Sequence, residues 1–147
     1  MKKSFTKEEY SKYVKSVSPN SKLFTNVINA FAVGGLICVI GQIIINILKA
    51  RGLDLEIVSS LTSIIMVFLG AFLTALNVYD DIGKFAGAGS IVPITGFANS
   101  VVSPAMEFKT EGYVMGMGAK MFVIAGPVIV FGICSSIIAG IIHYFIM

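Results

Sequence analysis

An uncharged stretch of sequence from Phe85 to Met106 is the feature that most restricts how this chain can fold. Hydrophobic segments flank the stretch, and charged residues stand at both of its ends. Glycine and proline interrupt it at Gly87, Gly89, Pro93, Gly96 and Pro104. Because proline lacks the amide donor and clashes with the preceding helical turn, one continuous helix is not expected. Irregular apolar backbone of this kind is typical of ion and solute sites in membrane proteins.

The composition indicates an integral membrane protein. Of the 147 residues, 56% are hydrophobic and only 13% are charged, whereas a soluble domain carries about a quarter charged residues. We expect an all-α polytopic protein with a single membrane domain at 23–147 and a basic segment at 1–22. The basic segment holds six lysines and two glutamates. Because positive charge stays on the cytoplasmic side, the N-terminus is expected to be cytoplasmic.

A short amphipathic helix is predicted within the basic segment. Thr6 and Glu9 fit a capping box, and the apolar residues that follow recur at helical spacing. These apolar residues are Tyr10, Tyr13, Val14 and Val17. The helix should end near Ser18-Pro19 and lie on the head groups of an anionic leaflet. A solvated basic tail is the alternative interpretation.

Three long apolar segments predict transmembrane helices at about 24–48, 57–78 and 113–147. As a straight helix the last segment would be about 52 Å long, which is more than a bilayer core needs. We therefore expect Gly126-Pro127 to kink or divide it. With three crossings and a cytoplasmic N-terminus, the C-terminus would lie on the opposite side.

Each of the three spans carries a stripe of small and polar residues. The stripes are Gly35, Gln42 and Asn46 in the first span, Ser63, Gly70, Thr74 and Asn77 in the second, and Gly132, Ser136, Gly140 and His143 in the third. Such stripes usually mark helix–helix contacts, although the lining of a pore would look the same. We expect the first two stripes to face each other or a common interior.

The broken segment at 82–106 is predicted to form two half-helices, one entering at 82–92 and one leaving at 95–102. This re-entrant hairpin would return Lys84 and Lys109 to the same side of the membrane. Water, or the side chains of Thr95, Asn99 and Ser100, could pair with the backbone groups freed at the break. Ser103-Pro104 resembles the start of a further helix.

Lysines surround the broken segment, which favours an anionic solute, as do the positive ends of half-helices. Lys120 lies in apolar surroundings, where it either serves the solute or extends to the head groups. The candidates for a pore or solute path are Lys84, Gly87, Gly89, Pro93, Thr95, Gly96, Asn99, Lys109 and Lys120.

The sequence contains no motif that points to catalysis. HExxH, GxSxG, a Walker loop and paired cysteines for a metal are all missing, and there is one histidine. We expect no enzyme activity, no cofactor, no resident metal and no nucleic acid partner. Cys38 and Cys134 lie in apolar runs, where lone cysteines behave as small hydrophobes. The functions that remain are permeation and assembly. Three spans are few for a complete solute pathway across a membrane, so an oligomer is expected.

Two long motifs resemble one known family. KFAGAGSIVPITGFANSVVSPAMEFKTEG, from Lys84 to Gly112, and GMGAKMFVIAGPVIVFG, from Gly116 to Gly132, are similar to the stage V sporulation AC/AE family of membrane proteins. The resemblance covers nearly the whole chain. Its length and its N-terminal extension are most similar to the AC-type members.

The resemblance implies a polytopic protein of the inner membrane of the forespore and spore. Such proteins move dipicolinic acid, as its calcium chelate, into the developing spore and out at germination, with channel-like and mechanosensitive behaviour implied for the AC type. The implied partners are AE-type sibling membrane subunits and a soluble thiolase-like AD subunit, in a homo- or hetero-oligomer. The leading hypothesis is a channel or transporter subunit for dipicolinate. The alternative is a non-conducting scaffold that assembles its siblings into the channel.

Overall fold

The fold is all-α. A computed structural model describes residues 6–18 and 21–146, and within these residues the regular structure is helical, without strands. Three segments are long and apolar enough to span a membrane. They are α2 (Leu23–Ala50), α3 (Leu55–Ala75) and a longer segment that joins the π-helix η2 (Tyr113–Gly118) to α7 (Ala119–Ile146). The predicted polytopic helical membrane protein is confirmed.

Helix α1 (Lys7–Val17) forms where the capping box predicts it. The backbone amide of Thr6 donates to the Glu9 carboxylate at 3.0 Å, and the backbone amide of Glu9 donates to Thr6 Oγ1 at 3.4 Å. The helix ends at Val17 with Ser18 as its C-cap. Pro19, which belonged to the predicted end, lies outside the described residues. The position of α1 on a membrane surface stays a prediction.

Replacing Thr6 by alanine should speed amide hydrogen exchange in α1 about fivefold, because loss of an N-cap costs about 1 kcal/mol. Ser11→Ala, an exposed change within the same helix, should not speed exchange.

The hydrogen bond from the Thr6 backbone lowers the pKa of Glu9 from its usual 4.5. The contribution of Glu9 should therefore be complete above about pH 4.5 and lost as the pH falls through the lowered pKa. Exchange measured by mass spectrometry across this pH range would check both statements.

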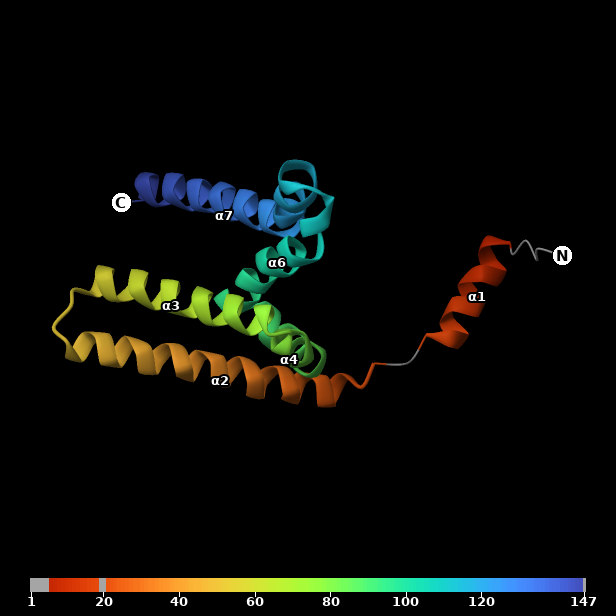
Figure 1. The fold of residues 1–147 in the computed structure, drawn as a ribbon, viewed down its shortest axis with the longest axis horizontal. Helices are drawn as coiled ribbons and strands as arrows, with labels where there is room; N and C mark the ends of the chain where they lie inside the picture. The colour runs from red at the N-terminus through yellow and green to blue at the C-terminus, as the bar shows by residue number, and fades with distance from the viewer. Residues whose placement is uncertain (1–5, 19–20, 147) are drawn as a thin grey trace.

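The membrane helices form a hairpin and a separate span, joined by a diagonal helix. Figure 1 shows α2 and α3 side by side and antiparallel, with α6 (Ile94–Glu107) running from the end of α3 to the start of α7. Helix α7 then runs back in the direction of α2, and its contacts are mainly with α6 and η2. The end of α7 therefore lies at the opposite end of the hairpin from the start of α2.

The apolar stretch is broken at Pro93, as predicted, and again at Gly87. Helices α4 (Val78–Ala86) and α5 (Ala88–Ile91) form its first half, and α6 forms its second half. At Gly87 φ is 51°, a conformation that glycine adopts without strain. The prediction of one entering half-helix at 82–92 is therefore wrong. Asn77 also has a positive φ of 58°, and the second span ends at Ala75 instead of 78.

Two further prolines lie inside helices, contrary to prediction. Pro104 lies within α6, so Ser103-Pro104 does not begin a new helix. Pro127 lies within α7, which is continuous from Ala119, so the predicted division at Gly126-Pro127 is wrong. The chain turns earlier, at Gly112 with φ 96° and through η2. Prolines within membrane helices are tolerated where neighbouring groups satisfy the freed backbone.

Candidate functional site

The break between α5 and α6 is held by a buried hydroxyl that the sequence did not single out. Tyr79 is 3% exposed, and its Oη lies 2.7 Å from the Ser90 carbonyl oxygen and 2.8 Å from Thr95 Oγ1. A phenol hydroxyl can donate to the carbonyl and accept from the threonine. Three pieces of the broken segment, α4, α5 and α6, are thereby joined at one atom. The side chains expected to pair with the freed backbone bond elsewhere: Thr95 to the Tyr79 hydroxyl, Asn99 to Thr74, and Ser100 to the Phe97 carbonyl within α6.

Glycines let the broken segment approach the two long spans at backbone distance. A methyl group at Gly89 would lie 2.7 Å from the Ala30 carbonyl carbon, so α5 rests directly on α2. A methyl group at Gly70 would lie 2.7 Å from the Thr95 carbonyl oxygen, so α6 rests directly on α3. Gly96 is packed in the same way against Ser90 and Ile91 across the break. The segment is therefore fixed between α2 and α3 by contacts that a side chain would prevent.

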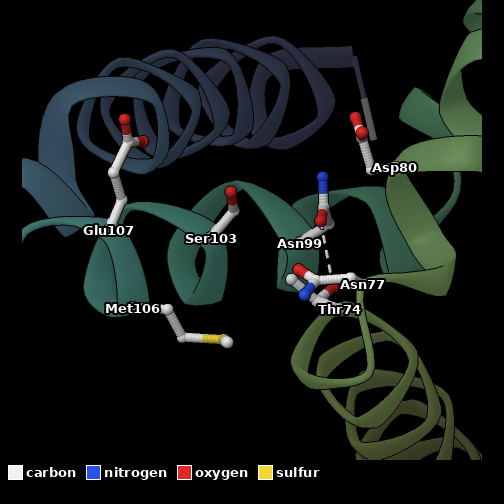
Figure 2. A pocket seen from close by; sticks show the side chains of 7 residues that line it. All are labelled: Thr74, Asn77, Asp80, Asn99, Ser103, Met106 and Glu107. Atoms are coloured by element: carbon white, nitrogen blue, oxygen red, sulfur yellow. Dashed lines mark hydrogen bonds between the residues drawn. The ribbon is translucent and has the colours of Figure 1, made fainter.

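A polar cavity of about 410 Å³ lies where α3, α4 and α6 meet. It is lined by Thr74, Asn77, Asp80, Asn99, Ser103, Met106 and Glu107. Figure 2 shows Asn99, Ser103 and Glu107 in a row along α6, four residues apart, with their polar groups on one side of the helix. Thr74 Oγ1 donates to Asn99 Oδ1 at 2.9 Å, which ties this row to α3.

A second cavity of about 340 Å³ adjoins the first, because Asp80 and Asn99 line both. Its other lining residues include Lys84, Gly96 and the hydroxyl-bearing Tyr79 and Ser90. The two cavities therefore meet between α4 and α6. Of the predicted solute-path residues, the structure brings Lys84, Gly96 and Asn99 together here.

The charges of the site are mixed, which differs from the predicted preference for an anion. Lys84 Nζ lies 2.6 Å from Asp80 Oδ2 and 3.3 Å from Asp81 Oδ1, so its charge is offset by two carboxylates. These groups are largely exposed, so the pairs contribute little to stability. Lys120 Nζ lies 4.5 Å from the centre of the Phe108 ring, as a cation–π contact. Lys109 lies in the 3-10 helix η1 (Lys109–Glu111) beyond α6.

The remaining candidates for the solute path lie outside the two adjoining cavities. Gly87 lines a hollow of about 320 Å³ between α2 and α4, together with Lys84. Gly89 packs on α2, and Pro93 is the N-cap of α6. Thr95 binds Tyr79 and is 5% exposed.

The stripes of the first two spans do not face each other, contrary to prediction. Gly70 and Thr74 are buried, but they pack against α6 and not against α2. Ser63 is exposed, and Asn77 lines the larger cavity. The first stripe, Gly35, Gln42 and Asn46, lies on an exposed face of α2. The third stripe, Gly132, Ser136, Gly140 and His143, is exposed along α7.

Sequence reasoning missed Tyr79, Asp80, Ser103 and Glu107 as members of the site. A signal was present for two of them, because Asn99, Ser103 and Glu107 are spaced by four and share one helix face. No comparable signal pointed to Tyr79, which reaches Ser90 and Thr95 across two turns of the chain.

Comparison with known proteins was made against families, curated sequences and solved structures. Residues 26–142 match the family described as SpoVAC/SpoVAEB sporulation membrane protein. The chain is 44% identical over 139 residues to stage V sporulation protein AC of Bacillus subtilis (strain 168). That alignment covers 94% of this chain and 93% of the relative. No solved structure matches the chain.

Proposed function

Given that this chain belongs to the SpoVAC/SpoVAEB family of sporulation membrane proteins, we propose that it is a subunit of a channel or transporter for dipicolinic acid. The solute would cross as its calcium chelate, inward during spore formation and outward at germination. The role would be permeation and not catalysis. The membrane would be the inner membrane of the forespore and spore, with the N-terminus on its cytoplasmic side.

The polar cavity and the smaller cavity that adjoins it are the observation that supports this proposal. Calcium prefers oxygen ligands, and Asp80, Asn99 and Glu107 offer carboxylate and amide oxygens in the larger cavity. Lys84 pairs with Asp80 and Asp81, and it could exchange that pairing for a free carboxylate of the solute in the smaller cavity. A lining that carries both negative and positive charges therefore suits a metal chelate of a dicarboxylate better than a bare anion. Calcium enters this proposal as part of the solute.

The position of α6 supports a response to membrane tension. Helix α6 packs on α3 on one side and on α7 on the other, and its polar row forms one wall of the larger cavity. Tension that pulls α7 away from the α2–α3 hairpin would act on α6 first. The wall of the cavity would then move, which is one way for tension to change access to the site.

Removing the cavity carboxylates should slow the flux of the chelate. In liposomes containing the full chain, with its sibling subunits where they are required, the double variant Asp80→Asn, Glu107→Gln should reduce flux about tenfold or more. Each lost charge-assisted contact of about 1.4 kcal/mol corresponds to a factor of ten. Dipicolinate release can be followed by terbium luminescence.

The matched control removes one aspartate and one glutamate that lie outside the two cavities. Asp54 and Glu56, at the start of α3, line neither cavity, so Asp54→Asn, Glu56→Gln should leave flux near that of the unaltered protein. Equal flux in the cavity variant, or equal loss in both double variants, would contradict a solute path through this cavity.

A scaffold that assembles AE-type and AD-type siblings without conducting is the second candidate. The surface of α7 favours it, because only Ala125 among its described residues is buried. Reconstitution separates the two candidates. Flux through this chain alone would support conduction, whereas flux only after a sibling is added, insensitive to Asp80→Asn, Glu107→Gln, would support the scaffold.

A further inference from the structure

The first stripe of α2 lies on the side of the helix that the rest of the chain does not cover. Figure 1 shows α2 at the edge of the molecule, with α3 on one side of it. At about 100° per residue, positions 35, 42 and 46 fall within about 40° of one another. The partly covered residues of α2, among them Ala30, Ile37, Gly41 and Leu48, lie on the opposite side.

Two amide side chains on this face lie in the second half of the span. Gln42 lies seven residues before Lys49, which is about 10 Å along the helix from the charged end of the span. Gln42 and Asn46 are exposed, and the residues one turn away from them on α2 are mostly apolar, apart from Lys49 next to Asn46. A polar side chain in contact with lipid tails cannot be hydrogen-bonded by them, so such groups normally face protein or water.

The two amides satisfy each other only in part. Gln42 Nε2 donates to Asn46 Oδ1 at 2.9 Å. In the described part of the chain no other side chain bonds to either group, so Gln42 Oε1 remains as an acceptor and Asn46 Nδ2 as a donor. The face therefore offers a free acceptor at Gln42 and free N–H donors at both amide nitrogens, one helical turn apart.

We infer that this face of α2 binds the same face of a second copy of the chain, as a parallel pair about a two-fold axis. In such a pair the contact of one residue with another is repeated in reverse, so each Asn46 can donate to the partner copy's Gln42. Copies of one chain insert in the same direction, which places these amides at equal depth. Gly35, with open space around it, allows the two helices to approach closely. The inference does not depend on which solute the protein carries.

Disulfide cross-linking of the full chain, alone in liposomes, tests this pairing. Cys38 and Cys134 are exposed and would first be replaced by alanine. Single cysteines at Gly35→Cys and Val39→Cys should then form dimers on oxidation, because disulfides need Cα atoms within about 7 Å. Leu36→Cys and Ile40→Cys are the matched controls. They are exposed and at nearly the same depth, but about 100° further round the helix, and should give little dimer.

The amides themselves are tested in the Val39→Cys background. Adding Gln42→Leu and Asn46→Leu should lower the yield of dimer about tenfold, since interhelical hydrogen bonds in membranes are worth about 1–2 kcal/mol in peptides. Unchanged helical content by circular dichroism would show that the variant still folds. The inference is overturned if positions 35 and 39 give no dimer, if 36 and 40 cross-link equally well, or if the leucine variants do not lower the yield. A dimer that appears only when a sibling subunit is added would assign the face to that subunit instead.

Discussion

Replacing Gly89 by alanine should destabilise the membrane domain by about 3 kcal/mol, the upper end of what overpacking usually costs. The new methyl group would meet the backbone of Ala30 in α2, including its carbonyl carbon at 2.7 Å. A backbone atom within a long helix cannot rotate away as a side chain can. Helix α5 would have to lift from α2, and the broken segment would lose one of its two supports. Thermal unfolding in detergent, followed by circular dichroism, measures this loss.

Gly41→Ala is the control for this prediction, because a methyl group there meets nothing within 4 Å. Alanine is favoured over glycine within a helix by up to about 1 kcal/mol, so this control should leave stability unchanged or raise it. If Gly89→Ala unfolds at the same temperature as Gly41→Ala, then α5 does not rest on α2 as described.

Replacing Tyr79 by phenylalanine should cost about 1–3 kcal/mol of stability, because it leaves a buried acceptor without its partner. The Ser90 carbonyl and the Thr95 hydroxyl would both lose the group that joins them. The ring would remain, so packing would change little. Tyr144→Phe, at an exposed position, should have no comparable effect in the same unfolding measurement.

A double-mutant cycle separates the hydrogen bond from other effects of Tyr79→Phe. Thr95→Val should destabilise the unaltered protein more than it destabilises the Tyr79→Phe variant, because the shared bond is already lost there. Additive costs would show that Tyr79 stabilises the fold through packing alone.

The sequence predicts the structural features that depend on the conformational limits of single residues. It misses those that depend on contacts with residues far away in the chain. The break at Pro93 and the capping box at Thr6 follow from the conformational limits of those residues, and both appear in the structure. Proline usually ends or kinks a helix, but α6 continues through the partly covered Pro104 and α7 through the exposed Pro127. Prolines are tolerated in membrane helices, so the local preference of proline does not decide where these two helices end.

Periodicity likewise identifies a helix face without identifying what covers it. Gly70 and Thr74 were expected to meet α2, but they meet α6. The spacing of Gln42 and Asn46 gave no indication that their face would be left open. The cavity was predicted only in part, because Asp80 and Glu107 stand at opposite ends of the broken segment and line one cavity only through the return of the chain.

The attachment of α7 mainly to α6 and η2 has a consequence for how the protein loses its structure. Helices α2 to α6 are held to one another by backbone-to-backbone packing, whereas most of α7 shares no buried surface with them. Cooperative units follow such differences in contact, and each unit has its own free energy of opening. We therefore expect the last span to detach before the remainder unfolds. Heating should then give two transitions, and the second of them is the one that reports the effects of Gly89→Ala and Tyr79→Phe.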